Sequence, residues 1–305
     1  MISRWAPIVV VEVGLSCVLA SPASTGAAAL RRPPETAPAL RVQARPSAPG
    51  DVIVLTVIAS RPLDASRVDV FDHVVPMWST ASATRWVTVI GVDVETKPGR
   101  YPLTVRGLAT TGEPVTVGGT LTVTSKAFGT RRLLVEPKYS EPPASERARI
   151  AAEARRLGAL FSASAAERYW HPPFQAPVGA RASSPFGVRS VFNGQPRSRH
   201  NGVDFASPAG DPVHAPGAGR VVLAEPLYFT GNTVIIDHGQ GLYSLLAHLE
   251  RMVVKSDDVV ARNDIVGYVG ATGRATGPHL HWTVRLQGAR VDPLLLVSRT
   301  RALSQ

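Results

Sequence analysis

Short apolar runs separated by turn residues restrict this 305-residue chain to a mainly β fold. In the first part of the chain the runs recur about every ten residues and are rich in Val, Ile and Thr, as in the strands of β-sandwiches. Clusters of Pro, Gly and Asp separate them. We therefore predict an immunoglobulin-like β-sandwich at residues 39–125, with strands at Leu40–Ala44, Val52–Ala59, Val68–Val75, Arg85–Glu95, Tyr101–Ala109 and Val115–Thr124.

One of these strands and two tryptophans indicate where the core of the sandwich lies. Residues 52–59 are apolar at both alternating sets of positions, which predicts a central strand buried on both faces. Trp78 and Trp86 are interpreted as core residues, with a carbohydrate-binding platform as the alternative. Nothing in this part of the chain has the pattern of a catalytic site.

Residues 126–182 break the β pattern and are predicted to contain a strand, a helix and an extended linker. The strand is expected at residues 131–139 and the linker at residues 169–182, which contain several prolines. Between them, residues 144–169 are rich in Ala, Arg, Glu and Leu, and a Pro-Pro pair precedes them. Apolar residues recur there at helical spacing and predict one stripe that packs on a domain or on the junction, formed by Ile150, Ala154, Leu157, Leu160 and Phe161.

The pattern of turns and short apolar runs returns at residues 183–298 and predicts a second β domain. We expect no helix of useful length in it. Its strands are expected at Gly219–Ala224, Thr233–Asp237, Leu242–Ala247, Met252–Val254, Val266–Val269 and His281–Leu286.

The N-terminal segment resembles an export signal. Residues 1–28 combine a short basic start, an apolar stretch and the cleavage motif Val18-Leu19-Ala20, and residues 29–38 are predicted to be a disordered spacer. We therefore expect export to the periplasm or the cell envelope. Cys17 raises lipidation as an alternative, which Gly14 disfavours because a lipidation motif has an aliphatic residue there.

The net charge restricts the possible binding partners of the protein, and the cysteine content restricts its possible disulfides. The net charge is +10 and the sequence pI about 10.4, which favours an anionic partner. The basic residues are spread out and only 6% of residues are aromatic, so we expect an anionic envelope polymer and no nucleic acid. Peripheral association with the envelope fits the same charge. Cys17 is the one cysteine, which excludes an intramolecular disulfide.

Histidines gather in the second β domain. Six of the eight lie between His200 and His281. His279 and His281 are two residues apart in a predicted strand, so both imidazoles point to one face. His200 and Asp204 are four apart, and a bend at Gly202 brings their side chains together. An N, O, N ligand set with one open position is typical of catalytic zinc sites.

These motifs resemble those of the lysostaphin-type (LytM-like) zinc metallopeptidases, family M23. The resemblance covers about residues 183–295 and rests on four pieces in the right order. They are HNGVD at 200–204, GNTVIIDHGQGLYSLLAHL at 231–249, GATGRATGPHLH at 270–281, and the HLH pair within the last. One departure is Leu246, where the family often has an aromatic residue. The resemblance implies an antiparallel β-sheet with zinc at the floor of a narrow groove.

The resemblance also implies roles for five residues. His200, Asp204 and His281 would be the Zn2+ ligands, and His248 and His279 would activate the water and stabilise the tetrahedral intermediate. The other histidines of the domain, His214 and His238, are interpreted as structural. Strand-end or turn roles are expected for two nearby carboxylates, Asp237 and Asp292.

The predicted function is therefore zinc-dependent hydrolysis of peptide bonds in bacterial peptidoglycan. The family substrates include pentaglycine bridges and D-alanyl–diaminopimelate cross-links, and the sequence favours neither. The alternative is a non-enzymatic or autoinhibited regulator of the cell wall, which the presence of all five site residues disfavours. A basic polymer-binding protein is a third hypothesis, supported by net charge alone.

Overall fold

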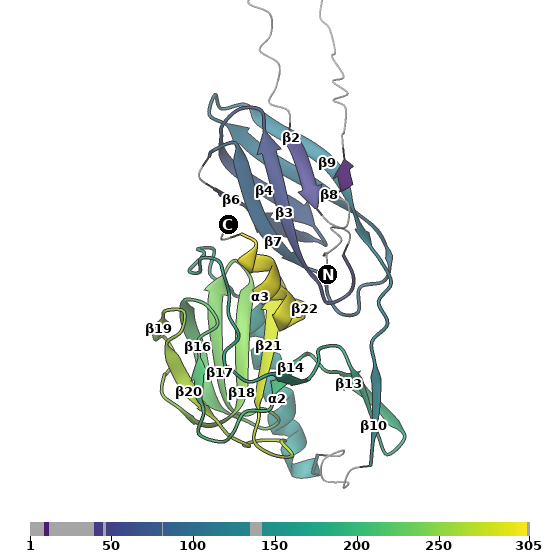
Figure 1. Ribbon diagram of the computed structural model, residues 1–305, viewed down its shortest axis with the longest axis vertical. Helices are drawn as coiled ribbons and strands as arrows, with labels where there is room; N and C mark the ends of the chain where they lie inside the picture. The colour runs from purple at the N-terminus through teal and green to yellow at the C-terminus, as the bar shows by residue number, and fades with distance from the viewer. Residues whose placement is uncertain (1–8, 12–39, 45–46, 81, 135–141, 304–305) are drawn as a thin grey trace, which may run out of the picture. The chain divides into compact units, whose positions relative to one another are not determined.

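A computed structural model describes residues 9–11, 40–44, 47–80, 82–134 and 142–303. The signal-peptide prediction, with its cleavage motif and Cys17, and the spacer at 29–38 fall almost entirely outside these residues. The chain forms two compact units. The first consists of Met1–Pro46, Val54–Thr88 and Arg100–Thr122, and the second of Ser47–Ile53, Val89–Gly99 and Val123–Gln305. The predicted mainly β fold is confirmed (Figure 1).

The first nine strands form two sheets with antiparallel pairing. One has the order β1-β2-β3-β7-β6 and the other the order β5-β4-β8-β9. The predicted central strand, β3, lies between β2 and β7. The immunoglobulin-like topology remains a prediction. The strands are β1 (Val9–Val11), β2 (Leu40–Ala44), β3 (Val52–Ala59), β4 (Leu63–Val70), β5 (His73–Pro76), β6 (Trp78–Ser79), β7 (Arg85–Gly91), β8 (Gly99–Ala109) and β9 (Pro114–Val123).

The strand predicted at residues 68–75 is wrong, because the chain turns within it. Phe71 and Asp72 have φ of 49° and 61° and connect β4 to β5. Two successive left-handed residues make the two-residue hairpin turn whose twist matches antiparallel strands. The tryptophans of this region differ from each other in burial. Trp86 is buried, as expected of a core residue, whereas Trp78 is half-buried.

The second unit contains a sheet with the main order β11-β14-β21-β18-β17-β16-β19 (Figure 1). Strands β15, β20 and β22 pair at its sides, and a small sheet has the order β10-β12-β13, with β10 parallel to β12. The strands are β10 (Thr130–Leu133), β11 (Ala182–Ser184), β12 (Arg189–Phe192), β13 (Gln195–Arg199), β14 (Gly202–Phe205), β15 (Pro212–His214), β16 (Gly219–Leu227), β17 (Gly231–Gly239), β18 (Leu242–Met252), β19 (Val259–Val260), β20 (Ile265–Val269), β21 (Leu280–Leu286) and β22 (Ala289–Val291).

Strand register assigns the residues of β18 and β21 to the two faces of this sheet. Ala247 is paired with His281, and residues directly opposite each other in an antiparallel pair point to the same face. Leu246 is paired with Trp282 and points to the other face, where both are fully buried. Leu246, the departure from the family pattern, is therefore a core residue on the face opposite His281.

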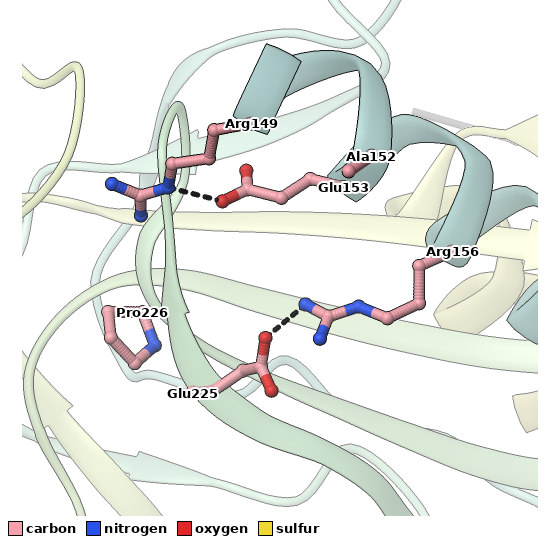
Figure 2. A pocket seen from close by; sticks show the side chains of 6 residues that line it. All are labelled: Arg149, Ala152, Glu153, Arg156, Glu225 and Pro226. Atoms are coloured by element: carbon pink, nitrogen blue, oxygen red, sulfur yellow. Dashed lines mark hydrogen bonds and ion pairs between the residues drawn. The ribbon is translucent and has the colours of Figure 1, made fainter. Parts of the chain in front are cut away.

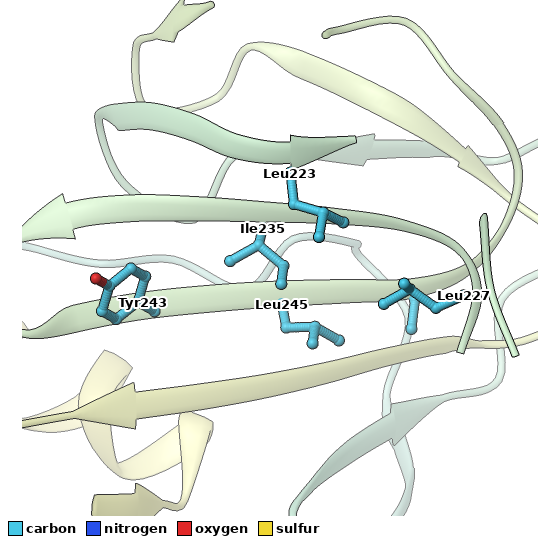
Figure 3. Close-up of a cluster of buried hydrophobic side chains, with 6 residues drawn as sticks. Leu223, Leu227, Ile235, Tyr243 and Leu245 are labelled. Atoms are coloured by element: carbon cyan, nitrogen blue, oxygen red, sulfur yellow. The ribbon is translucent and has the colours of Figure 1, made fainter. Parts of the chain in front are cut away.

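The predicted amphipathic helix packs on the face that carries His281. The helix α2 (Arg147–Phe161), preceded by the short 3-10 helix η1 (Ala144–Glu146), presents Leu157, Leu160 and Phe161 to the sheet. The Tyr243 hydroxyl donates to the Leu160 carbonyl at 2.9 Å. Figure 3 shows the side chains of the sheet that this helix covers, and the full cluster is Leu223, Leu227, Ile235, Tyr243, Leu245 and Ala247. Because Ala247 is opposite His281, α2 covers the sheet beside that histidine.

Two helix predictions need correction. Helix α2 ends at Phe161 and not near Tyr169, because the following residues bind to the sheet. The Ser164 hydroxyl and the Ala165 N–H both donate to the Asp237 carboxylate, at 2.8 and 2.9 Å. The domain predicted to be β throughout also ends in a helix, α3 (Pro293–Arg301). The start of α3 was predictable from the sequence, because Asp292 is a typical N-cap residue and proline follows at the first helical position. In the structure, the Asp292 side chain accepts a hydrogen bond from the Leu294 N–H.

The predicted extended linker also contributes to the core. Trp170 and Phe174 are each 1% exposed. Phe174 packs edge-on against His238 at 5.0 Å between ring centroids, and the His238 ring bonds to Ser244 on the face opposite His281. The segment at 169–182 is therefore part of the second unit. No helix among the described residues is long and apolar enough to cross a membrane.

Residues 89–99 join the second unit through a bidentate ion pair. The Asp93 carboxylate accepts from Arg290 Nη2 at 2.6 Å, and from Arg290 Nε and its backbone N–H at 2.9 Å. Burial raises the pKa of Asp93, but these hydrogen bonds outweigh it and the net pKa is lowered.

We expect Asp93→Ala to destabilise the second unit by about 1–3 kcal/mol, because it removes three charge-assisted hydrogen bonds from a partly buried arginine. Urea unfolding measures this change. Asp69→Ala is the matched control, since it removes an exposed Asp69–Arg106 pair and should cost under about 1 kcal/mol. Equal costs for the two substitutions would contradict the prediction.

Candidate metal centre

Three side chains predicted as ligands converge on one point. Asp204 Oδ1 lies 3.0 Å from His200 Nε2 and 2.7 Å from His281 Nδ1, and the two nitrogens are 3.2 Å apart. Among the described residues, these three form a group able to hold a metal ion. The structure thus brings together the predicted N, O, N set.

Strand pairing explains how residues 77 positions apart in the sequence meet. Asp204 on β14 is directly opposite His281 on β21, so both point to the same face. His200 precedes β14 in a loop, as predicted, and Gly202 begins the strand. A Cβ at Gly202 would lie 2.4 Å from the Trp282 carbonyl and 2.8 Å from the His281 ring. Glycine is therefore required at 202, where the two strands approach closely.

Outer hydrogen bonds orient the two candidate ligand histidines. His200 Nδ1 donates to the Pro185 carbonyl at 3.0 Å, so Nε2, which faces Asp204, is the nitrogen that a metal would bind. His281 Nε2 lies 2.9 Å from the Thr283 hydroxyl, and donation to that oxygen leaves Nδ1 free to bind a metal. Such partners set the tautomer of metal-binding histidines and hold the ring in position.

His248 and His279 lie beside this cluster. Their ring centroids are 4.7 Å apart, and His279 Nε2 is 4.0 Å from Asp204 Oδ1. His248 Nδ1 donates to the Thr272 carbonyl, and His279 Nδ1 donates to the Gly277 carbonyl, both at 2.8 Å. In the neutral form of each ring, Nε2 is therefore the unprotonated nitrogen. His279 and His281 both lie beside His248 and Asp204, although β21 begins only at Leu280.

A bulge in β18 places His248. Its φ is 64°, in the left-handed region that non-glycine residues seldom adopt, and the pairing with β17 and β20 shifts register nearby. Ala247, the residue before the bulge, still pairs with His281. The bulge then turns the His248 side chain toward His279 and His281. Backbone strain of this kind is common at functional sites.

The electrostatics of the cluster suit cation binding. Burial raises the pKa of Asp204, but hydrogen bonds from His200 and His281 and their charges lower it far more, so this carboxylate stays ionised. Burial lowers the pKa of His200, whereas its bond to Asp204 raises it, with a net increase. Burial lowers the pKa of His248 to about 4, with the neighbouring histidines adding to the effect. His248 is therefore neutral at physiological pH.

The three ligand atoms fit a small tetrahedral cation. Zn–N and Zn–O bonds of about 2.0–2.2 Å place tetrahedral ligand atoms about 3.3–3.5 Å apart. The observed separations of 2.7, 3.0 and 3.2 Å need to widen by only a few tenths of an ångström. Two imidazoles and one carboxylate leave a fourth position open, and this donor set suits zinc.

Comparison with known proteins agrees with this geometry. Residues 198–293, which contain all five predicted site residues, match the model of peptidase family M23. A crystal structure from Pseudomonas aeruginosa assigned to peptidase M23 is 34% identical in sequence, with a TM-score of 0.65. The alignment covers 83% of this chain and 96% of that one. The chain belongs to peptidase family M23.

Curated relatives of this M23 family member match over part of the chain. A "DD-carboxypeptidase/endopeptidase Mpg" of Neisseria meningitidis serogroup B is 38% identical over 128 residues, or 42% of this chain. The "Peptidoglycan DD-endopeptidase ShyA" of Vibrio cholerae is 39% identical over 115 residues, or 37% of this chain. The matched segments span 30% and 27% of the lengths of these two relatives.

The remaining histidines of the M23 domain lie outside the cluster, in agreement with their structural interpretation. His238 is fully buried, where its Nδ1 donates to the Ala218 carbonyl at 2.8 Å and its Nε2 accepts from the Ser244 hydroxyl at 2.9 Å. His214 Nδ1 donates to the Asn263 carbonyl at 2.9 Å. Asp237 and Asp292 have the expected turn and capping roles.

His238 should make the stability of this M23 domain dependent on pH. Burial lowers its pKa to about 4, so between pH 6.5 and 4 the unfolded chain binds the proton that the folded chain excludes. Stability is therefore present above pH 6.5 and is lost on acidification, by about 2 kcal/mol between pH 7 and 5. His238→Gln should reduce this pH dependence in urea unfolding, whereas the exposed His73→Gln should not. If the free energy of unfolding depended equally on pH in the wild type and in His238→Gln, His238 would not be the source of the pH dependence.

Sequence reasoning missed the residues that orient the cluster. Thr283 follows His281 by two positions on the same strand face, a spacing that the sequence displays. Thr272 and Pro185 act through backbone carbonyls, which leave no signal in the residue type.

A separate hollow of about 270 Å³ lies between α2 and β16, lined by Arg149, Ala152, Glu153, Arg156, Glu225 and Pro226 (Figure 2). Its charges are paired as Arg149–Glu153 and Arg156–Glu225.

Proposed function

We propose that this protein is a zinc-dependent endopeptidase that hydrolyses peptide cross-links or stem peptides of bacterial peptidoglycan. The convergence of His200, Asp204 and His281 on one point is the observation that carries the proposal. The names of the curated relatives, which include peptidoglycan DD-endopeptidases, support the substrate. The position of His248 and His279 beside the cluster supports catalysis over a purely regulatory role.

Zinc bound by His200, Asp204 and His281 would supply Lewis acidity, which polarises a peptide carbonyl and makes water acidic enough to attack near neutral pH. The outer bonds from Pro185 and Thr283 hold the two imidazoles in the tautomers that this binding needs.

The chain itself supplies the proton transfers. His248 is neutral and its Nε2 is free, because Nδ1 donates to the Thr272 carbonyl, so Nε2 accepts a proton from the attacking water. His279, held by the Gly277 carbonyl, is close enough to share this role and, once its Nε2 has taken up a proton, to donate a hydrogen bond to the developing oxyanion. The carbonyl carbon gains a bond to the water oxygen, the C–N bond breaks, and the amine leaves with the proton.

The N-terminal residues support export as part of the proposal. The apolar stretch and cleavage motif within residues 1–28 would direct the protein to the periplasm or the cell envelope, where peptidoglycan is found. The net charge of +10 favours association with anionic envelope polymers.

Digestion of purified cross-linked peptidoglycan tests the proposed activity. The mature protein is incubated with and without a zinc chelator, and the products are identified by mass spectrometry. We expect cross-linked dimers to disappear, the chelator to prevent this, and added zinc to restore it. A zinc-loaded protein that leaves all peptide bonds intact would contradict the proposal and favour the regulatory alternative.

A further inference from the structure

Two neighbouring loops hold the strained backbone of His248. Its φ of 64° is one that residues other than glycine seldom adopt, and such a conformation persists only where the surrounding structure fixes it. The His248 N–H donates to the Thr230 carbonyl at 2.8 Å, and its ring Nδ1 donates to the Thr272 carbonyl, also at 2.8 Å. The position of the candidate general base therefore depends on where these two carbonyls lie.

The two loops are in direct contact with each other. Residues 228–230 form the turn between β16 and β17, here called the β16–β17 turn, and residues 272–274 form part of the second loop. The Arg274 N–H donates to the Phe229 carbonyl at 2.9 Å. A Cβ at Gly231, directly after the turn, would lie 2.4 Å from a backbone atom of the second loop. Because the backbones are packed this closely, a shift of the β16–β17 turn displaces both carbonyls that hold His248.

Helix α2 anchors the β16–β17 turn through one carboxylate. Glu153 Oε2 accepts from the Tyr228 N–H at 2.9 Å, and Glu153 Oε1 accepts from Arg149 Nε at 2.8 Å (Figure 2). The Glu153 side chain is only 15% exposed, so water competes little for these bonds. An ionised acceptor makes such a hydrogen bond about twice as strong as a neutral one. This anchor precedes residues 198–293, the segment that matches the family model.

We propose that Glu153 is a positioning residue for His248. Its carboxylate fixes the β16–β17 turn, the turn fixes the Thr230 carbonyl, and that carbonyl holds the strained His248 backbone. This inference rests on the proposed function, because it assigns the support to the general base of the hydrolysis. Helix α2 thus has a second role besides covering the sheet, since it holds the proton acceptor in place.

The packing of α2 on the sheet does not depend on this carboxylate. The apolar contacts come from Leu157, Leu160 and Phe161. A second ion pair, Arg156–Glu225, joins α2 to strand β16 rather than to the turn (Figure 2). Removal of this second pair therefore provides a matched control for the loss of a carboxylate from the same surface.

Kinetics of the full-length, zinc-loaded Glu153→Ala variant on a soluble cross-linked peptide dimer test the proposal. We expect kcat to fall by about 10-fold, because the proton acceptor is misplaced, and KM to stay within about twofold. Zinc content should be unchanged, because the three candidate ligands lie on or beside β14 and β21. Glu153→Gln keeps one acceptor oxygen and should lose less in kcat, whereas Glu225→Ala should retain the wild-type kcat.

Hydrogen exchange measured by NMR on the same full-length proteins gives a readout that does not need activity. In Glu153→Ala we expect the Tyr228 and His248 amides to exchange at least about 10-fold faster than in wild type. The amides of residues 242–246, which precede the bulge in β18, should exchange as in wild type.

The outcomes separate this proposal from the proposed function. Faster exchange at His248 in a protein whose wild type hydrolyses no peptide would contradict the proposed function and support the positioning by Glu153. Unchanged exchange at His248, equal acceleration at residues 242–246, or an equal loss of kcat in Glu225→Ala would overturn the positioning role. A wild-type kcat in Glu153→Ala would overturn it as well.

Discussion

Alanine at position 281 is expected to abolish both metal binding and hydrolysis. His281 provides one of three candidate ligand atoms and is bonded to a second, Asp204, at 2.7 Å. Its loss leaves two ligands, below the three protein ligands typical of catalytic zinc sites. We expect kcat/KM to fall by at least about 1,000-fold because metal affinity and transition-state stabilisation are lost together. Atomic absorption of the purified variant measures the metal, and peptide release measures activity.

The His248→Ala variant distinguishes the role of a metal ligand, assigned to His281, from the role of a general base, assigned to His248. It should bind zinc as wild type does and lose about 100- to 10,000-fold in turnover, because a general acid–base group is removed and no ligand is. His214→Ala should retain both properties, since His214 bonds the Asn263 carbonyl outside the cluster. Full zinc content in the His281→Ala protein would show that the ligand assignment is wrong.

Removing the chain before residue 183 should prevent the M23 domain from folding stably. A fragment of residues 183–305 lacks Leu157, Leu160 and Phe161, which cover the cluster around Ile235 and Leu245. It also lacks Trp170 and Phe174, each 1% exposed. Full burial of a large apolar side chain contributes about 1.5–3 kcal/mol, so two buried and three partly buried side chains contribute at most about 7–15 kcal/mol, comparable with the whole stability of a typical domain.

A fragment of residues 123–305 is the matched control, because it retains α2, Trp170 and Phe174 and lacks the same two segments of the second unit, residues 47–53 and 89–99, as the shorter fragment. We expect it to unfold cooperatively on heating, and the shorter fragment to show no cooperative transition and to aggregate through the exposed cluster. Circular dichroism with temperature and size-exclusion chromatography measure both. A shorter fragment with an equal melting temperature would contradict the contribution of α2 to the domain.

Four of the five site residues were predictable from local spacing, as the pairs His200 with Asp204 and His279 with His281, whereas His248 came from the resemblance to family M23. The pair at 279 and 281 shows its common face in the strand period, and the glycine at 202 marks the approach of β14 to β21. The resemblance to family M23 supplied the roles. The orienting carbonyls of Pro185 and Thr272 were not predictable, because a backbone carbonyl is present at every residue and only the folded chain selects one.

The sequence by itself therefore determined the mainly β class, the family and the residues of the candidate metal centre. These follow from side-chain type and short-range period, which any fold of the chain must satisfy. Only the tertiary structure decided where α2 ends, that it lies on the metal-centre face, and that the segment at 169–182 is core. The pairing of Ala247 with His281 also depends on it. Each of these depends on contacts between residues far apart in the chain, which local propensity does not specify.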